Sequence, residues 1–486
     1  MVGLGPKELN VRTVLHTTLH RTVDWCKAVR VTINMLPDLV LLKIFEFYKG
    51  RKIDAWHTLV HVCQQWRIIV FGSPRRLDLR LRCRASTPVR TKLDVWPPLP
   101  IFVGATWDEP EKSGWGMDNI VAALERNDRI SGVAVSNILS SDFEELLAAM
   151  QKPFPALKSL EMSTGSITVP TIPASFLGGS APCLQSLYLN GFPFPRLPNF
   201  LFSAPHLVHL SLLRIPDSGY FSPEALAAGL STLTSLEIFI MTSESPQFCS
   251  GLNSRSLPLQ TRSLLPVLTE LQFRGVDKYL EDLVARIDAP LLNELEIAFI
   301  HQQMPATSQL TQFIYRTPKF KAQGEARVTF SRWDVSVKFP QKFDGNIHLG
   351  ILCTLTDEQL STLPLVCGSS AGRALVPTVE RLYVLPHRDS PLLWRDNIES
   401  GRRLNLLRPF FAVKSLYISR EFMPWIAPAL QELVGERATE VLPVLQNLYL
   451  ETVASIPVQE AIGQFVAARQ LSGHPIAVFY WEYERD

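Results

Sequence analysis

The sequence lacks the long apolar segments and the cysteine pairs that mark several large protein classes. No apolar run approaches the ~20 residues that a membrane-spanning helix needs, so we expect no membrane association. Met1–Asn34 mixes His, Arg and Thr with apolar residues rather than forming a signal-peptide core, although this basic segment leaves a transit peptide as an alternative. The seven cysteines form no Cys-x-x-Cys pair, which is typical of reduced thiols in a cytoplasmic or nuclear protein.

The sequence also lacks recognisable catalytic, nucleotide-binding and metal-binding motifs. It contains no Gly-x-Ser-x-Gly elbow, phosphate-binding glycine loop or dinucleotide fingerprint. Two His pairs, His16 with His20 and His57 with His61, have the spacing of one helix face, but no third ligand accompanies either pair. We therefore predict a protein that is not an enzyme and that has neither a cofactor nor a metal site.

Nine segments of the chain repeat one pattern of apolar residues. Each has an apolar residue, two variable residues, Leu, one variable residue and a final apolar residue; Pro stands two positions before seven of them. The last two apolar residues alternate with a variable one, as in a short strand that buries one face. The segments span 157–162, 184–189, 207–212, 233–238, 268–273, 292–297, 379–384, 413–418 and 445–450.

The spacing of these segments predicts a repeating strand–helix unit. Consecutive segments begin 23 to 35 residues apart, except for one gap of 87 residues that holds weaker candidates at 328–330 and 347–349. Between segments, Ser222-Pro223 places Pro at a first helical position, and Ser141 with Glu144 forms a capping box. This register resembles an irregular leucine-rich repeat, in which Asn190 is the best match to the Asn that usually follows the strand. The resemblance implies an α/β solenoid, a curved parallel sheet with outer helices; an ordinary layered α/β domain is the alternative.

The variable strand positions of such a solenoid would line its concave surface. Tyr is a favoured interface residue when exposed, although its strand propensity also explains its presence there. We predict that a target protein, whose identity the sequence does not reveal, binds along this stripe. The predicted stripe contains Tyr188, Asn190, His209, Glu237, Phe239, Gln272, Arg274, Glu296, Tyr383, Tyr417 and Tyr449.

An apolar N-terminal segment does not follow the repeat. Leu36-Pro37-Asp38 precedes a predicted helix that reaches Tyr48, in which Lys43 and Glu46 are the polar residues after Asp38. A helix that is apolar on most of its circumference must be covered on more than one side, and a unit of this size cannot do so alone. The first hundred residues hold 17 Lys and Arg against 7 Asp and Glu, whereas the rest of the chain is acidic. The basic excess of the first hundred residues favours binding to an acidic partner.

This segment resembles an F-box. The resemblance rests on Leu36-Pro37-x-Leu39, Ile44-Phe45 and Val62-Cys63-x-x-Trp66-Arg67, followed by Leu77-x-Leu79. An F-box followed by leucine-rich repeats is similar to the substrate receptors of Skp–cullin–F-box ubiquitin ligases, especially the large fungal sets of these proteins. The resemblance implies that apolar side chains bind a Skp-type adaptor, and through it a cullin–RING ligase. Carried over by position, the adaptor-binding residues are Leu36, Pro37, Leu39, Leu42, Phe45, Cys63 and Trp66, with Ile44, Val62 and Ile69 expected in the module's own core.

We accordingly divide the chain into three parts. These are an N-terminal extension (1–33) whose composition favours loose structure, an F-box-like helical module (34–75) and a repeat solenoid (76–486). The basic run 74–84 alternates Leu with Arg and is interpreted as the first solenoid strand; it has no interleaved stacking aromatics, so nucleic acid is not a favoured partner. The alternative to a ligase subunit is a leucine-rich-repeat interaction scaffold outside the ubiquitin system, with the helical segment as its cap.

Overall fold

The computed structural model shows a repeat protein that divides into two compact units. The smaller comprises Met1–Leu81 and Thr91–Phe102, and the larger comprises Arg82–Arg90 and Val103–Asp486. The predicted extension 1–33 lies almost entirely outside the described residues, as does Leu77. The structure describes residues 33, 36–49, 59–72, 79–86, 88–96, 98–105, 116–136, 140–165, 169–243, 262–300, 308–320, 324–330, 334–340, 345–352, 363, 366–367, 372, 375–386, 403–451 and 455–482.

Among its described residues, the smaller unit contains the helices α2 (Asp38–Lys49) and α4 (Gln64–Gly72). They contact each other, and the ring of Phe45 packs against that of Trp66 with 4.7 Å between centroids. Three further elements cross the boundary between the units: β1 (Leu79–Arg82), α5 (Val89–Val95) and β2 (Ile101–Ala105). β1 alternates buried Leu with more exposed Arg, as the basic run predicts.

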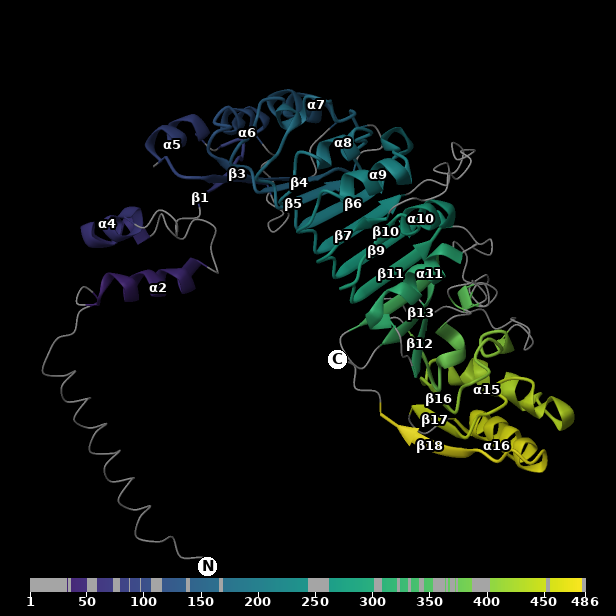
Figure 1. Cartoon of the computed structure of the whole chain (residues 1–486). Coiled ribbons are helices and arrows are strands. Elements are labelled where there is room, and N and C mark those ends of the chain that lie inside the picture. The colour runs from purple at the N-terminus through teal and green to yellow at the C-terminus, as the bar shows by residue number, and fades with distance from the viewer. Residues whose placement is uncertain are drawn as a thin grey trace, which may run out of the picture. The chain divides into compact units, whose positions relative to one another are not determined.

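The larger unit is built on one long sheet whose strands follow one another in space much as they do along the chain (Figure 1). A separate pair consists of β8 (Ser263–Leu264) and β10 (Ile287–Asp288). From β3 onward the order in the long sheet is β3 (Ile130–Ser136), β4 (Ser159–Ser163), β5 (Ser186–Asn190), β6 (His209–Ile215), β7 (Ile238–Ser243), β9 (Glu270–Gly275), β11 (Glu294–Phe299), β14 (Asn346–Leu352), β13 (Asp334–Pro340), β12 (Glu325–Phe330), β15 (Arg381–Pro386), β16 (Ser415–Ile418), β17 (Asn447–Glu451) and β18 (Ala477–Trp481).

Helices cover one face of this sheet, and neighbouring helices pack against each other (Figure 1). Ser222 caps α9 by accepting a hydrogen bond from the Ala225 N–H, and Pro223 opens that helix, as predicted. We call the opposite side of the sheet the open face. The helices whose bounds lie within the described residues are α6 (Met117–Leu124), α7 (Ser140–Ala149), α8 (Leu197–Leu201), α9 (Pro223–Leu230), α10 (Asp277–Val284), α11 (Ser308–Arg316), α15 (Met423–Gln431) and α16 (Ile456–Leu471), with short 3₁₀ turns at Phe176–Gly179, Asp217–Gly219, Pro318–Phe320, Val376–Thr378 and Gly435–Thr439.

The core consists of ladders of apolar side chains in register across the sheet. Leu160, Leu187 and Leu210 occupy equivalent positions of three successive strands and are all fully buried. Because each repeat places the same side of its strand against the helices, the buried ladders continue from repeat to repeat. The predicted α/β leucine-rich-repeat-like solenoid is therefore confirmed.

The 87-residue gap in the repeat holds an antiparallel insertion in the otherwise parallel sheet. The chain passes from β11 to β12, which pairs with β15, and then returns through β13 and β14 to pair with β11. The two weak candidate segments of the gap belong to β12 and β14, whose apolar residues are buried. The insertion keeps the sheet continuous while reversing the order of three strands.

One cation, Arg469 of α16, lies in the interior of the last repeats with 0 % exposure. Its guanidinium donates hydrogen bonds to the carbonyl oxygens of Ala438 (3.2 Å), Pro443 (3.3 Å) and Leu445 (3.1 Å). Burial lowers the pKa of Arg469, because desolvation disfavours the charged form. Arg469 thus ties α16 to the segment that leads into β17.

Candidate functional site

The first candidate surface is the outward side of α2 in the smaller unit. Leu39 is 72 % exposed, and Val40 and Ile44 are also exposed. Leu42 and Phe45 lie on the opposite side of the helix and are buried. Because residues four apart share a helix face, Val40 and Ile44 are adjacent on the surface. We call Leu39, Val40 and Ile44 the α2 apolar face.

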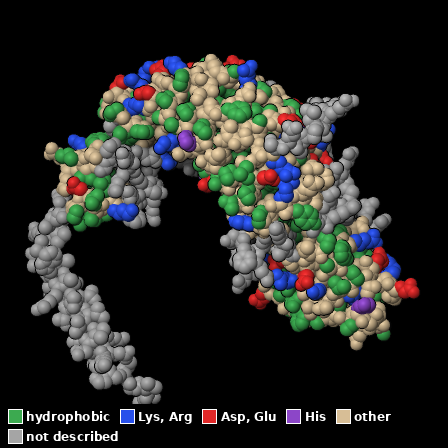
Figure 2. Space-filling view, viewed as in Figure 1, with side chains coloured by type: hydrophobic (Ala, Val, Ile, Leu, Met, Phe, Trp, Pro, Cys, Tyr) green, Lys and Arg blue, Asp and Glu red, His purple; other side chains and the backbone are tan. Residues whose placement is uncertain are grey.

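The neighbouring helix α4 presents a similar mixture. Trp66 is half-buried against Phe45, and its backbone N–H donates to the Cys63 Sγ at 3.5 Å. The Arg67 Nε donates to the Val60 carbonyl oxygen at 3.0 Å, which secures the start of the helix. Ile68 is exposed on the outside of α4. Figure 2 shows hydrophobic side chains on the visible surface of this unit.

The structure divides the predicted adaptor-binding residues into three groups. Pro37 and Leu39 are exposed; Leu36, Cys63 and Trp66 are half-buried; Leu42 and Phe45 are buried. Among the expected core residues, Ile69 is buried, but Ile44 and Val62 are exposed. The surface that a partner can reach therefore includes Ile44 and Val62, whereas Leu42 and Phe45 belong to the module's own core.

The second candidate surface is the open face of the sheet in the larger unit. The variable strand positions lie there, half-buried or exposed, beside the buried ladder residues. Glu237 is exposed just before β7 begins, and its carbonyl oxygen accepts from the N–H groups of Thr269 and Glu270. The predicted stripe residues on the open-face strands are Tyr188, Asn190, His209, Gln272, Arg274, Glu296, Tyr383, Tyr417 and Tyr449.

Phe239 is not on the open face: it is 0 % exposed and lies in register with the core residues Leu210 and Leu271. The repeat pattern of this unit begins at Leu236 and not at Leu233. Leu233 occupies the preceding turn, where its carbonyl oxygen accepts from the Leu236 N–H. Ile238 and Ile240 therefore occupy the open-face positions of β7.

Aromatic side chains stack on the open face at the C-terminal end of the sheet. The ring centroids of Tyr383 and Tyr417 are 4.2 Å apart, as are those of Tyr417 and Tyr449, and Phe479 follows at 5.0 Å from Tyr449. In-register parallel pairing produces this row because equivalent positions of adjacent strands lie side by side. Burial, followed by the neighbouring tyrosines, raises the pKa of Tyr417, so its hydroxyl is neutral at physiological pH. We call these four residues the aromatic row.

Charged residues of the insertion adjoin the aromatic row. The Arg327 guanidinium lies 5.6 Å from the centroid of the Tyr383 ring. The Glu325 carboxylate pairs with both Arg327 (3.0 Å) and Arg381 (3.4 Å), and Lys338 lies in register beside Arg327. The sequence pattern did not identify Arg327 and Lys338, because their strands lie in the gap where the repeat is interrupted. This arrangement can bind polar and aromatic groups of a protein partner.

We expect the stacking of Tyr417 to stabilise the C-terminal strands. Tyr417→Leu removes three ring–ring contacts, with Tyr383, Tyr449 and Trp481, and should lower the free energy of unfolding by about 1–2 kcal/mol. Tyr188→Leu is a matched control, because Tyr188 holds the same strand position between Glu161 and Ser211. Urea unfolding monitored by near-ultraviolet circular dichroism compares the two; equal losses would contradict a stabilising stack.

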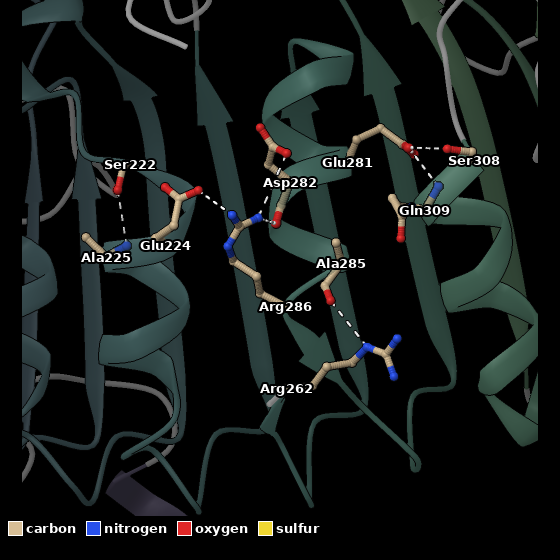
Figure 3. Close-up of polar contacts among 10 residues, drawn as sticks. All are labelled: Ser222, Glu224, Ala225, Arg262, Glu281, Asp282, Ala285, Arg286, Ser308 and Gln309. Atoms are coloured by element: carbon tan, nitrogen blue, oxygen red, sulfur yellow. Dashed lines mark hydrogen bonds and ion pairs between the residues drawn. The ribbon is translucent and has the colours of Figure 1, made fainter. Parts of the chain in front are cut away.

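Polar contacts on the helix-covered side join successive repeats (Figure 3). The Glu281 carboxylate of α10 accepts from the N–H groups of Gln309 (2.7 Å) and Leu310 (2.8 Å) at the start of α11. Arg286 contacts the carboxylates of Glu224 and Asp282. Burial raises the pKa of Glu281 despite these donors. All these groups are used in holding helices together, and we assign them no chemistry.

Within the described residues, no three metal-ligating side chains gather into a cluster, and no helix has the length and apolar character needed to cross a bilayer. No family model matches the chain, and no curated protein matches it either. Among solved structures, the chain is similar to the leucine-rich repeat-containing protein LegL7 from Legionella pneumophila, with 12% sequence identity and a TM-score of 0.26. That similarity covers 82% of this chain and 98% of LegL7.

Proposed function

We propose that this chain is a protein-interaction scaffold without catalytic activity of its own, and that it acts as a substrate receptor of a Skp–cullin–F-box ubiquitin ligase. The observation that supports this proposal is the α2 apolar face. Leu39 is 72 % exposed even though the helix already has a buried side. Covering such a side chain contributes about 1.5–3 kcal/mol to an association, so an apolar partner is favoured. The F-box-like spacing of the segment indicates the class of partner, which is a Skp-type adaptor.

In this role the two units have separate tasks. The smaller unit binds the adaptor, and the open face of the larger unit binds a target protein. Ubiquitin transfer to the target then accelerates because its lysines are held near the charged conjugating enzyme, which supplies the chemistry. The half-buried tyrosines of the aromatic row are suited to target binding because they offer rigid contact area together with hydroxyl groups. We infer a cytoplasmic or nuclear location, where such ligases act.

Co-purification tests this function. The full-length chain, produced together with a fungal Skp-type adaptor, should elute with it as a stoichiometric complex in size-exclusion chromatography. Addition of a cullin–RING pair should shift the complex to a larger size. If the chain and the adaptor elute separately, the ligase role is wrong, and an interaction scaffold outside the ubiquitin system is the remaining function.

A further inference from the structure

Among the described residues, β18 is the outermost strand at one end of the sheet, and its outer edge is unpaired. Within the described residues its one neighbouring strand is β17, with which it pairs in parallel from Ala477 to Trp481. Edge strands usually carry a charge, a proline or a bulge that prevents further pairing. The sequence Ala-Val-Phe-Tyr-Trp of β18 contains no charged residue, proline or glycine, and its register with β17 is uninterrupted. The edge is therefore competent to accept another strand.

Two residues of β18 occupy core positions without being covered. Val478 and Tyr480 lie in register with Leu448 and Leu450, which are buried. Yet Val478 is 36 % exposed and Tyr480 is 58 % exposed. In the parallel repeats described before β18, the equivalent positions lie beside a further paired strand and are buried. The last repeat thus exposes apolar surface beside an open edge.

The backbone groups of the same two residues face this edge. The Ala477 N–H donates to the Gln446 carbonyl oxygen at 2.8 Å, so the backbone N–H and C=O groups of Ala477 point toward β17. In a parallel strand, alternate residues direct their N–H and C=O groups to opposite sides. The groups of Val478 and Tyr480 therefore point away from β17 and can bond to an incoming strand.

We propose that β18 pairs with β18 of a second copy of this chain, antiparallel, around a two-fold axis at Phe479. Val478 then lies opposite Tyr480 of the second copy, and these two hydrogen-bonded pairs use the outward backbone groups. Phe479 lies opposite Phe479 of the second copy as the non-hydrogen-bonded pair. The sheet becomes continuous through both copies, and the aromatic row continues across the axis.

The sequence of β18 favours its own copy as the occupant because its side chains match in size under this symmetry. Val478 faces Tyr480 on the core face and Phe479 faces Phe479 on the open face, whereas the ring of Trp481 packs back against Tyr383 and Tyr417. Cross-strand pairs that combine aromatic with smaller or β-branched side chains stabilise a sheet. A two-fold interface also closes on itself, so pairing ends at a dimer. This inference does not depend on adaptor binding.

Cross-linking tests the register of the proposed pairing. At a non-hydrogen-bonded antiparallel pair the Cα atoms are about 4.5 Å apart, within the range that a disulfide spans. Phe479→Cys should therefore form a covalent dimer under mild oxidation. Val478→Cys is the matched control. Residue 478 of one copy lies diagonally across from residue 478 of the second copy, about 7–8 Å away, so the two cysteines should remain uncross-linked. Both variants are made in a Cys183→Ser background, since Cys183 is exposed.

Sedimentation velocity of the full-length chain tests the association itself. The wild-type chain should sediment as a dimer at micromolar concentration. Val478→Pro removes one outward donor per copy without touching a bond to β17, and should weaken the dimer about tenfold or more. Val478→Thr keeps shape and donor and should leave the dimer intact. A wild-type monomer at all concentrations, an open series of larger species, or a Val478→Pro dimer of unchanged affinity would each overturn the proposal.

Discussion

Replacing Leu39 by Asp is expected to weaken binding of the Skp-type adaptor strongly. The substitution removes an apolar side chain that is 72 % exposed and places a carboxylate where the adaptor would cover the α2 apolar face. Lost apolar burial and carboxylate desolvation together should weaken binding by about 100-fold or more. The smaller unit should stay folded, because Leu41, Leu42 and Phe45 on the other side of α2 are unchanged. Isothermal titration calorimetry with purified adaptor measures the loss.

The chain offers a matched control for this variant. Leu471 of α16 is 90 % exposed, so Leu471→Asp makes the same chemical change on a helix of the larger unit. Its adaptor affinity should equal that of the wild type. Thermal unfolding of both variants should match the wild type, since neither side chain is in a core. Equal affinity of Leu39→Asp and wild type would remove the α2 apolar face from the interface.

Replacing Arg469 by Met is expected to destabilise the last repeats strongly. The three carbonyl oxygens that accept from its guanidinium would lose their donors inside the protein. Each unsatisfied buried acceptor costs about 1–3 kcal/mol. Part of the combined cost of the three acceptors is offset, because the variant no longer has to bury a cation. We expect a net loss of about 3 kcal/mol in the free energy of opening α16. Hydrogen exchange of the α16 amides, followed by mass spectrometry, reports this quantity.

Arg437→Met provides the comparison for Arg469. Arg437 is more than half exposed and forms a 2.8 Å ion pair with Glu440 on the surface. Exposed ion pairs contribute about 0–1 kcal/mol, so exchange from α16 should change little in this variant. If Arg469→Met and Arg437→Met exchange alike, the guanidinium does not hold α16 in place.

The repeat pattern was sufficient to predict the solenoid because it records the burial of successive strands directly. Between Leu233 and Met241, however, the pattern was misleading. The pattern with its Leu fits from Leu233, whereas the structure uses a register three residues later, in which Phe239 takes the place of that Leu. The choice depends on which Leu ends the preceding turn, and that is decided by packing between repeats. As a result, Phe239 was predicted on the wrong side of its strand.

The insertion between β11 and β15 could not be predicted, for a different reason. The strands β12, β13 and β14 pair with their chain neighbours, but their spatial order is reversed because β14 pairs with β11, whose residues lie 52 positions earlier in the sequence. Arg327 and Lys338, which adjoin the aromatic row, were consequently absent from the predicted stripe. The continuous apolar run of β18 is visible in the sequence and could have revealed Phe479.

The F-box-like helix shows a further limit of sequence reasoning. Since α2 is apolar on nearly all sides, its periodicity does not identify which side faces the core. Contact with Trp66 decides this by burying Phe45. That contact turns Ile44 outward, although the sequence suggested a core role for it. The exposed part of the candidate site was therefore only partly predictable.

Hydrogen exchange of the full-length chain with and without a Skp-type adaptor tests the central claim most directly. Amides of α2 and α4 should exchange more slowly in the complex, while strands of the larger unit keep their rates. Unchanged exchange throughout α2 and α4 at saturating adaptor would contradict the proposed role of this chain as a ligase receptor.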